Sequence, residues 1–166
     1  VGTMNYYQTT ARVDIQTAML IYDPLLERDP KTGNLLPHLV TEWKTLNDTT
    51  WEFKLRPGVK FHNGNPLNAE CIRFTIEDRI LDTNQKSPLL PNWKWVKKVE
   101  VVNDLTFRII TDGPYPLVLQ RLNFMFPWDA KWVKEMVAKN GEEYLSSNAM
   151  GTGPFKFVRF VKGERI

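Results

Sequence analysis

The chain has two histidines and one cysteine, the side chains that zinc sites use most, and they do not form a ligand set. His38 follows a proline at a predicted strand end, His62 precedes a turn, and Cys71 falls on the apolar face of a predicted helix. No histidine or cysteine partner stands at the spacing that zinc sites use. We therefore expect two surface or turn histidines, a buried cysteine and no bound metal.

Patterns for catalysis and for nucleotide binding are also missing. Glu42, Glu52, Glu70 and Glu77 lie beside Lys or Arg, so we expect solvated carboxylates rather than a pair with split pKa values. None of the serines stands in a Gly-x-Ser-x-Gly nucleophile elbow. The segment 151–154, Gly-Thr-Gly-Pro, places proline where a phosphate cradle needs a free N–H. The sequence predicts no enzyme, no catalytic residue and no cofactor.

The six tryptophans could offer flat indole surfaces to a ligand. Trp93 and Trp128 fall in predicted loops, where they could face a cleft and stack on sugar rings, or instead cover the edge of the core. The other four fit predicted core positions; they are Trp43, Trp51, Trp95 and Trp132.

Composition and charge narrow the class of protein further. The chain has 166 residues, of which 42% are apolar, and none of its apolar runs approaches the length of a membrane helix. Its formal net charge is +3, but the basic residues are scattered among acids, so we expect no nucleic-acid partner. These features fit a chain that buries a core and does not span a membrane.

The elements that would position these residues are both helical and extended. Helices are predicted over 15–22 after an Asp14 N-cap, from Asn68 to about 81 with Arg73 and Arg79 outside, over 117–122, and over 130–140 between Asp129 and Gly141. A short edge strand or an extended connection is predicted over 35–37, and strands are predicted over 51–55, 59–61 and 154–161. Hairpin turns are predicted at 47–48 and at 103–104, where the turn joins strands 98–102 and 105–110. Residues 83–92 are predicted as a loop. Mixed elements without strict alternation predict an α/β or mixed α+β fold.

Three motifs in one order connect the chain to a known family. Residues 22–43, YDPLLERDPKTGNLLPHLVTEW, precede the strand, turn and helix pattern LRPGVKFHNGNPLNAE of residues 55–70, and GTGPF follows at 151–155. This order resembles family 5 of the extracellular solute-binding proteins, the peptide-binding and nickel-binding receptors of ABC importers. Cys71 and Val40 depart from residues usual in that family, and both are expected to be tolerated.

The resemblance implies a fold and an arrangement of domains. It implies a fragment of the type II periplasmic-binding-protein-like fold, with a mixed sheet and flanking helices, covering only the N-terminal third of a two-lobed protein. Residues 1–21 would begin the first ligand-binding lobe, 22–145 would form a small α+β subdomain inserted in it, and 146–166 would supply a return strand into it.

The resemblance also implies a function. It implies a receptor, in the periplasm or held at the outer face of the membrane as a lipoprotein, that captures short peptides between two lobes and delivers them to the permease. No export segment is expected within this chain. The alternatives are a receptor of the same family for an oligosaccharide or a metal chelate, a carbohydrate-binding wall built on Trp93 and Trp128, and an interaction module for the permease or a sensor.

The resemblance places one wall of the ligand cleft within this chain. The residues expected there are Thr10, Arg12, Leu89, Trp93, Phe124 and Phe126. The alternative for Arg12 is a solvated guanidinium beside the helix start. For Leu89 and the two phenylalanines it is ordinary packing in the core or between lobes.

Overall fold

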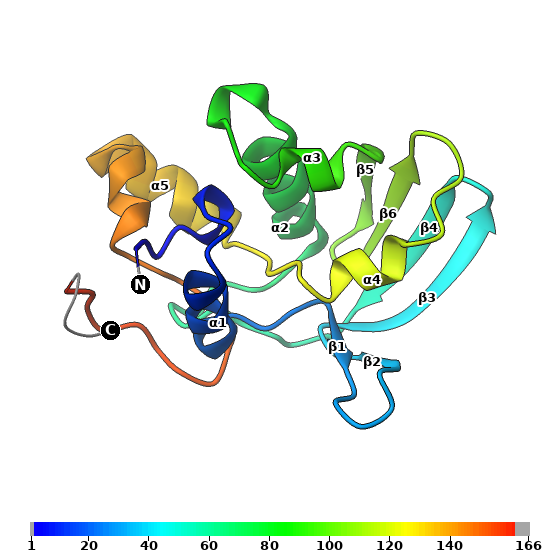
Figure 1. Cartoon of the computed structure of the whole chain (residues 1–166), viewed down its shortest axis with the longest axis horizontal. Helices are drawn as coiled ribbons and strands as arrows, with labels where there is room; N and C mark the ends of the chain where they lie inside the picture. Colours follow the sequence, from blue (N-terminus) through cyan, green and yellow to red (C-terminus); the bar gives the residue numbers. More distant parts are fainter. Residues whose placement is uncertain (1, 162–166) are drawn as a thin grey trace.

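Two sheets with flanking helices make up the computed structural model, which describes residues 2–161 (Figure 1). In chain order the elements are η1 (Tyr6–Gln8), α1 (Arg12–Ile21), β1 (Leu26–Arg28), β2 (Leu35–Pro37), β3 (Val40–Asn47), β4 (Thr50–Leu55), α2 (Ala69–Arg73), the π-helix η2 (Phe74–Leu81), η3 (Thr83–Gln85), α3 (Leu90–Trp93), β5 (Val96–Asn103), β6 (Thr106–Thr111), α4 (Val118–Leu122), α5 (Ala130–Asn140) and η4 (Glu142–Ser146). The predicted α/β class is confirmed.

The larger sheet has the strand order β3-β4-β6-β5, and β1 pairs with β2 separately. Every strand pair among residues 2–161 is antiparallel, so the expected mixed sheet does not occur within them. Alternate residues face opposite sides: Phe53, Phe107 and Ile109 are fully buried, whereas Lys54 faces outward and pairs with Glu42 at 2.8 Å. The sheet therefore contributes one apolar face to the core.

Both predicted hairpins are confirmed, with a small shift in the turn. Asn47 and Asn103 end their strands, and each side-chain oxygen accepts a hydrogen bond from the N–H two residues on, in Thr49 at 3.0 Å and in Leu105 at 3.0 Å. This local bond is the reason asparagine favours turns.

The helix that begins after Asn68 covers the sheet. As predicted, the Asn68 side chain caps it by accepting a hydrogen bond from the Cys71 N–H at 3.1 Å, and Cys71 is buried. After one α-helical turn and a half the chain continues as the π-helix η2, in which Thr75 accepts a hydrogen bond from the Trp128 N–H and donates one to the Cys71 carbonyl. The prediction that Arg79 lies outside is wrong, since its side chain is 5% exposed.

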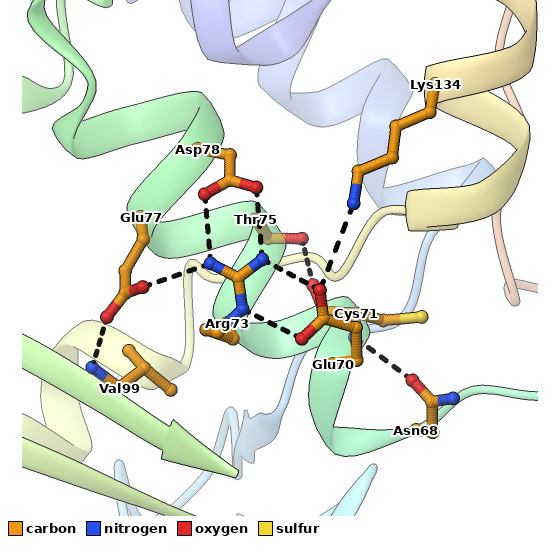
Figure 2. Close-up of polar contacts among 9 residues, drawn as sticks. All are labelled: Asn68, Glu70, Cys71, Arg73, Thr75, Glu77, Asp78, Val99 and Lys134. Atoms are coloured by element: carbon orange, nitrogen blue, oxygen red, sulfur yellow. Dashed lines mark hydrogen bonds and ion pairs between the residues drawn. The ribbon is translucent and has the colours of Figure 1, made fainter.

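A charged network joins this helix to the edge strand β5. Glu77 accepts hydrogen bonds from the Val99 N–H at 2.7 Å and from Arg73 at 3.1 Å, and Arg73 also contacts Glu70 and Asp78 (Figure 2). The Arg73 guanidinium is the main cause of the lowered pKa of the Glu70 carboxyl. Because Glu77 occupies a free N–H of the edge strand, the network protects that edge from pairing with another chain.

Three local predictions are wrong in identifiable ways. Asp14 does not cap α1; it lies inside the first turn, where it accepts hydrogen bonds from the Gly2 N–H and the Thr9 hydroxyl. The predicted strand 59–61 is reduced to a single bridge between Lys60 and Pro66. The predicted loop 83–92 contains η3 and the start of α3, because Pro91 is well suited to a first helical turn.

The segment that follows η4 returns to the start of the chain, but not as the predicted strand 154–161. Residues 156–160 have no regular structure, since no other strand within residues 2–161 pairs with them. Instead, Gly153 and Phe155 donate backbone hydrogen bonds to the carbonyls of Ile21 and Leu20, which places this segment against α1 (Figure 1).

Within the described residues, we find no helix with the length and apolar character needed to cross a bilayer.

Candidate ligand-binding site

Four of the six residues that the resemblance placed at the ligand cleft line one pocket. Leu89 and Trp93 come from the α3 region, and Phe124 and Phe126 from the segment after α4; the pocket has a volume of about 190 Å³. The complete lining, hereafter the aromatic pocket, is Tyr6, Ile15, Leu89, Asn92, Trp93, Arg121, Phe124 and Phe126.

The other two predicted residues, Thr10 and Arg12, are exposed and do not line the aromatic pocket. They lie in the connection from η1 to α1 and at the first residue of α1. Their binding role stays a prediction.

Hydrogen bonds between distant segments fix the shape of the aromatic pocket. The Ser87 hydroxyl donates to the Tyr7 carbonyl at 2.7 Å and thereby ties the stretch before α3 to η1. On the other side, the Asn123 amide donates to the Leu26 carbonyl at 3.0 Å, and the Leu25 N–H donates to the Met125 carbonyl at 3.1 Å. The segments that carry the lining residues are thus held together by hydrogen bonds to backbone groups as well as by packing.

The aromatic pocket has a buried floor and an exposed rim. Phe126 is 1% exposed and Trp93 5%, whereas Phe124 is 58% exposed. The hydroxyls of Tyr6 and Tyr7 both donate to the carbonyl oxygen of Phe126, which fixes the floor from below. Burial raises the pKa of Tyr6 well above its ordinary value, so its hydroxyl remains neutral.

Two polar residues, Arg121 and Asn92, interrupt this apolar lining. Arg121 Nε donates to the Tyr115 hydroxyl at 3.1 Å, and the Tyr115 ring stacks on Trp95 with 4.5 Å between centroids. Sequence reasoning missed both residues, along with Tyr6 and Ile15, because no motif or spacing marks them. Only the tertiary contacts bring them to the pocket.

Trp128 does not face a cleft. It is 2% exposed, with its ring centroid 4.9 Å from that of Tyr7 and the Arg79 guanidinium 5.3 Å from its own. An indole that stacks on a sugar needs an open face, so the carbohydrate wall expected from Trp93 and Trp128 is wrong for Trp128. Of these two tryptophans, Trp93 lines a pocket.

The two histidines serve local contacts. His62 Nε2 lies 2.7 Å from the Gly153 carbonyl, and His38 Nε2 lies 3.2 Å from the Asp23 carboxylate. Within residues 2–161 no three His, Cys, Asp or Glu side chains are grouped so that they could hold a metal ion.

The His38–Asp23 pair predicts a pH dependence of stability. The hydrogen bond to Asp23 is the main cause of a raised pKa at His38, and in turn lowers the pKa of Asp23. A raised folded-state pKa stabilises the fold below the ordinary histidine value of 6.5, and this contribution disappears as pH rises through the folded pKa. The Asp23 contribution is present above the ordinary value of 3.8 and is lost as pH falls through the lowered folded pKa.

We therefore expect the melting temperature of the full-length protein to exceed that of a His38→Gln variant most clearly between the ordinary pKa values of aspartate, 3.8, and histidine, 6.5. The gap should shrink by about pH 8.5, where the imidazole is neutral. Thermal melts of both proteins at about pH 5.5 and 8.5 measure it. A gap that stays constant between the two pH values would contradict this role of the pair.

The fold and the pocket define a class of protein. Antiparallel sheets with flanking helices and a small pocket are also found in the type II periplasmic binding proteins, whose fold this chain shares. The ABC transporter-associated periplasmic binding protein DppA from Helicobacter pylori, in complex with peptide STSA, matches with a TM-score of 0.84 at 25% identity, over 98% of this chain and 35% of that one. NikZ from Campylobacter jejuni in complex with Ni(L-His) matches with a TM-score of 0.81 at 25% identity, over 99% and 32%.

Sequence comparison identifies the family. Residues 34–166 match "Bacterial extracellular solute-binding proteins, family 5 Middle", so the chain belongs to this family and the predicted resemblance is confirmed. The Di/tripeptide-binding protein 4 of Pseudomonas aeruginosa (strain UCBPP-PA14) is 28% identical over 90% of this chain. The match covers 32% of that relative, so the chain spans about a third of the length of the curated relatives it matches.

Proposed function

We propose that this chain supplies one wall of the ligand cleft in the substrate-binding component of an ABC importer, which captures short peptides. The aromatic pocket carries the proposal: it gathers residues from η1, α1, the α3 region and the end of α4. Its volume of about 190 Å³ is below the roughly 300–1,000 Å³ typical of complete small-molecule sites. It therefore suits one side chain of a ligand, with the rest of the cleft supplied by the remainder of a longer protein.

The names of the relatives support peptides over other solutes. Two relatives are named as di/tripeptide-binding protein 4 and peptide transport periplasmic protein SapA, at 28% and 27% identity. NikZ, whose structure holds Ni(L-His), keeps a metal chelate as the alternative within the same family. Binding proteins of this kind, rather than enzymes, make up the family.

Location, partner and domain division follow from the same proposal. The receptor acts in the periplasm or at the outer face of the membrane and passes its ligand to a permease. Residues 1–21 and 146–166 belong to the first lobe, and 22–145 form the inserted subdomain; the bond from the Met4 N–H to the Ser146 carbonyl and that from Gly153 to Ile21 support this division. Closure of two lobes is favoured only by a ligand that contacts the closed state better than the open one.

Native mass spectrometry of the full-length protein, purified without refolding, tests this proposal. We expect a co-purified, heterogeneous set of short peptides that is released on denaturation. A single metal chelate or sugar would move the function to another branch of the family. An empty protein that binds none of these would instead favour the interaction module.

A further inference from the structure

The arginine of the aromatic pocket, Arg121, differs from the other arginines that are partly or fully buried in the described part of the chain. Arg73, Arg79 and Arg108 each contact at least one carboxylate within 3.0 Å. Arg121 has no carboxylate within 4.0 Å among residues 2–161, although it is partly buried. A guanidinium removed from water without a counter-charge is costly unless another group supplies the charge.

A hydrogen bond to Tyr115 fixes the orientation of the Arg121 side chain. Its Nε donates to the Tyr115 hydroxyl at 3.1 Å, and Tyr115 continues a stack through Trp95 to Trp93, with centroid separations of 4.5 Å and 5.6 Å. The two terminal nitrogens of Arg121 make no hydrogen bond within the described part of the chain. The one contact at Nε therefore leaves the ends of the guanidinium, the part that recognises carboxylates in bidentate fashion, for another partner.

The surroundings of Arg121 restrict what that partner can be. Six of the eight lining residues are apolar or aromatic, and the other two are Arg121 and the neutral Asn92. No acidic side chain lines the pocket, so its charge is positive. Such a site suits an anionic group joined to an apolar one, and a volume of about 190 Å³ admits a single such unit.

We propose that Arg121 binds a carboxylate of the ligand while the walls formed by Trp93, Phe124 and Phe126 hold an apolar side chain next to it. This deepens the proposed peptide-binding function and rests on it. The carboxylate is either the carboxyl terminus of a short peptide or an acidic side chain. Both sources place the same charged group at the same guanidinium.

Isothermal titration of the full-length protein, freed of co-purified ligand, tests the proposal. The probes are a tripeptide ending in leucine, its C-terminal amide, and an amide of the same length with glutamate beside the leucine. They are titrated into the unsubstituted full-length protein, hereafter the parent, and into three variants, Arg121→Gln, Arg121→Lys and Tyr115→Phe. Thermal melts show that each variant folds. Arg56→Gln is the matched control, because Arg56 is exposed and does not line the aromatic pocket.

We expect Arg121→Gln to weaken binding of one carboxylate-bearing probe by about tenfold to a hundredfold. Arg121→Lys should keep part of the affinity, Tyr115→Phe should lose less than Arg121→Gln, and Arg56→Gln should match the parent. A loss confined to the free tripeptide identifies the carboxyl terminus as the source, and a loss confined to the glutamate amide identifies the side chain. Equal affinities of parent and Arg121→Gln for every probe would overturn the inference and leave the peptide function intact.

If the unsubstituted full-length protein binds no peptide, the proposed function is refuted. A second measurement, with single amino-acid derivatives, then tests the inference about Arg121. N-acetylphenylalanine and its amide supply the apolar group with and without the carboxylate. A change in tryptophan fluorescence that a Trp93→Phe variant lacks reports their binding in the pocket. Binding of the acid that is lost in Arg121→Gln supports the inference. Equal binding of acid and amide, or binding of neither, overturns it.

Discussion

Replacing Gly151 by alanine is expected to destabilise the protein by about 3 kcal/mol or more. A Cβ atom at this position would lie 2.0 Å from the carbonyl oxygen of Ile21 and 2.7 Å from its carbonyl carbon. These are backbone atoms at the end of α1, so no rotation of a side chain relieves the overlap. The segment 151–153 would have to leave α1, which would also strain the bond from Gly153 to Ile21 at 2.8 Å.

Urea denaturation of the full-length protein measures this effect, and Gly64→Ala is the control. Gly64 has a φ of +92° but nothing within 4 Å of its missing Cβ, so alanine there carries conformational strain alone. That strain costs about 1–2 kcal/mol. If Gly151→Ala costs no more than Gly64→Ala, the close approach to Ile21 is not what requires glycine.

The second large effect is expected at the ion pair between Arg79, which is buried, and Glu142, which is half-exposed; Glu142→Gln should cost about 2–3 kcal/mol. Arg79 donates two hydrogen bonds to the Glu142 carboxylate, at 2.9 and 2.8 Å, and its side chain is 5% exposed. Its Nε has no hydrogen-bond partner, so Glu142 provides the main compensation for a buried charge. Removing the carboxylate would leave that charge unpaired against the Trp128 ring.

A double-mutant cycle separates this effect from ordinary loss of packing. Arg79→Met with Glu142→Gln removes both charges, and we expect the double variant to be more stable than Glu142→Gln alone. Glu42→Gln is the control, because Glu42 pairs with Lys54 at the surface, where side chains that are 66% and 55% exposed contribute about 0–1 kcal/mol. Equal costs at Glu42 and Glu142 would show that burial of Arg79 does not matter.

Local signals in the sequence predicted the elements well where one side chain sets the boundary. Asn68 and Asp129 cap their helices as predicted, and Asp129 accepts the Trp132 N–H at 3.1 Å. The α5 helix ends at Asn140, before Gly141, as predicted. Asp14 misled the prediction because a first-turn carboxylate can instead bond to residues outside the helix, here Gly2 and Thr9.

Longer-range features were less predictable. Arg79 was expected outside because charged residues usually are, yet the π-helix and η4 provide a partner for it 63 residues away. The strand predicted over 154–161 has the right alternation, but a strand requires a neighbour to bond to. Periodicity cannot show whether that neighbour is present.

The sequence by itself determined the family, because the motifs that carry the resemblance are local in the chain. Four residues of the aromatic pocket were also predicted from the sequence, because the family resemblance placed them at the ligand cleft; no sequence pattern predicted that they contact one another. Only the tertiary structure decided that Leu89, Trp93, Phe124 and Phe126 share one pocket and that Arg121 joins them. The reason is physical: these side chains come from segments far apart in the chain, and they meet through hydrogen bonds such as Ser87 to Tyr7 that no sequence pattern encodes.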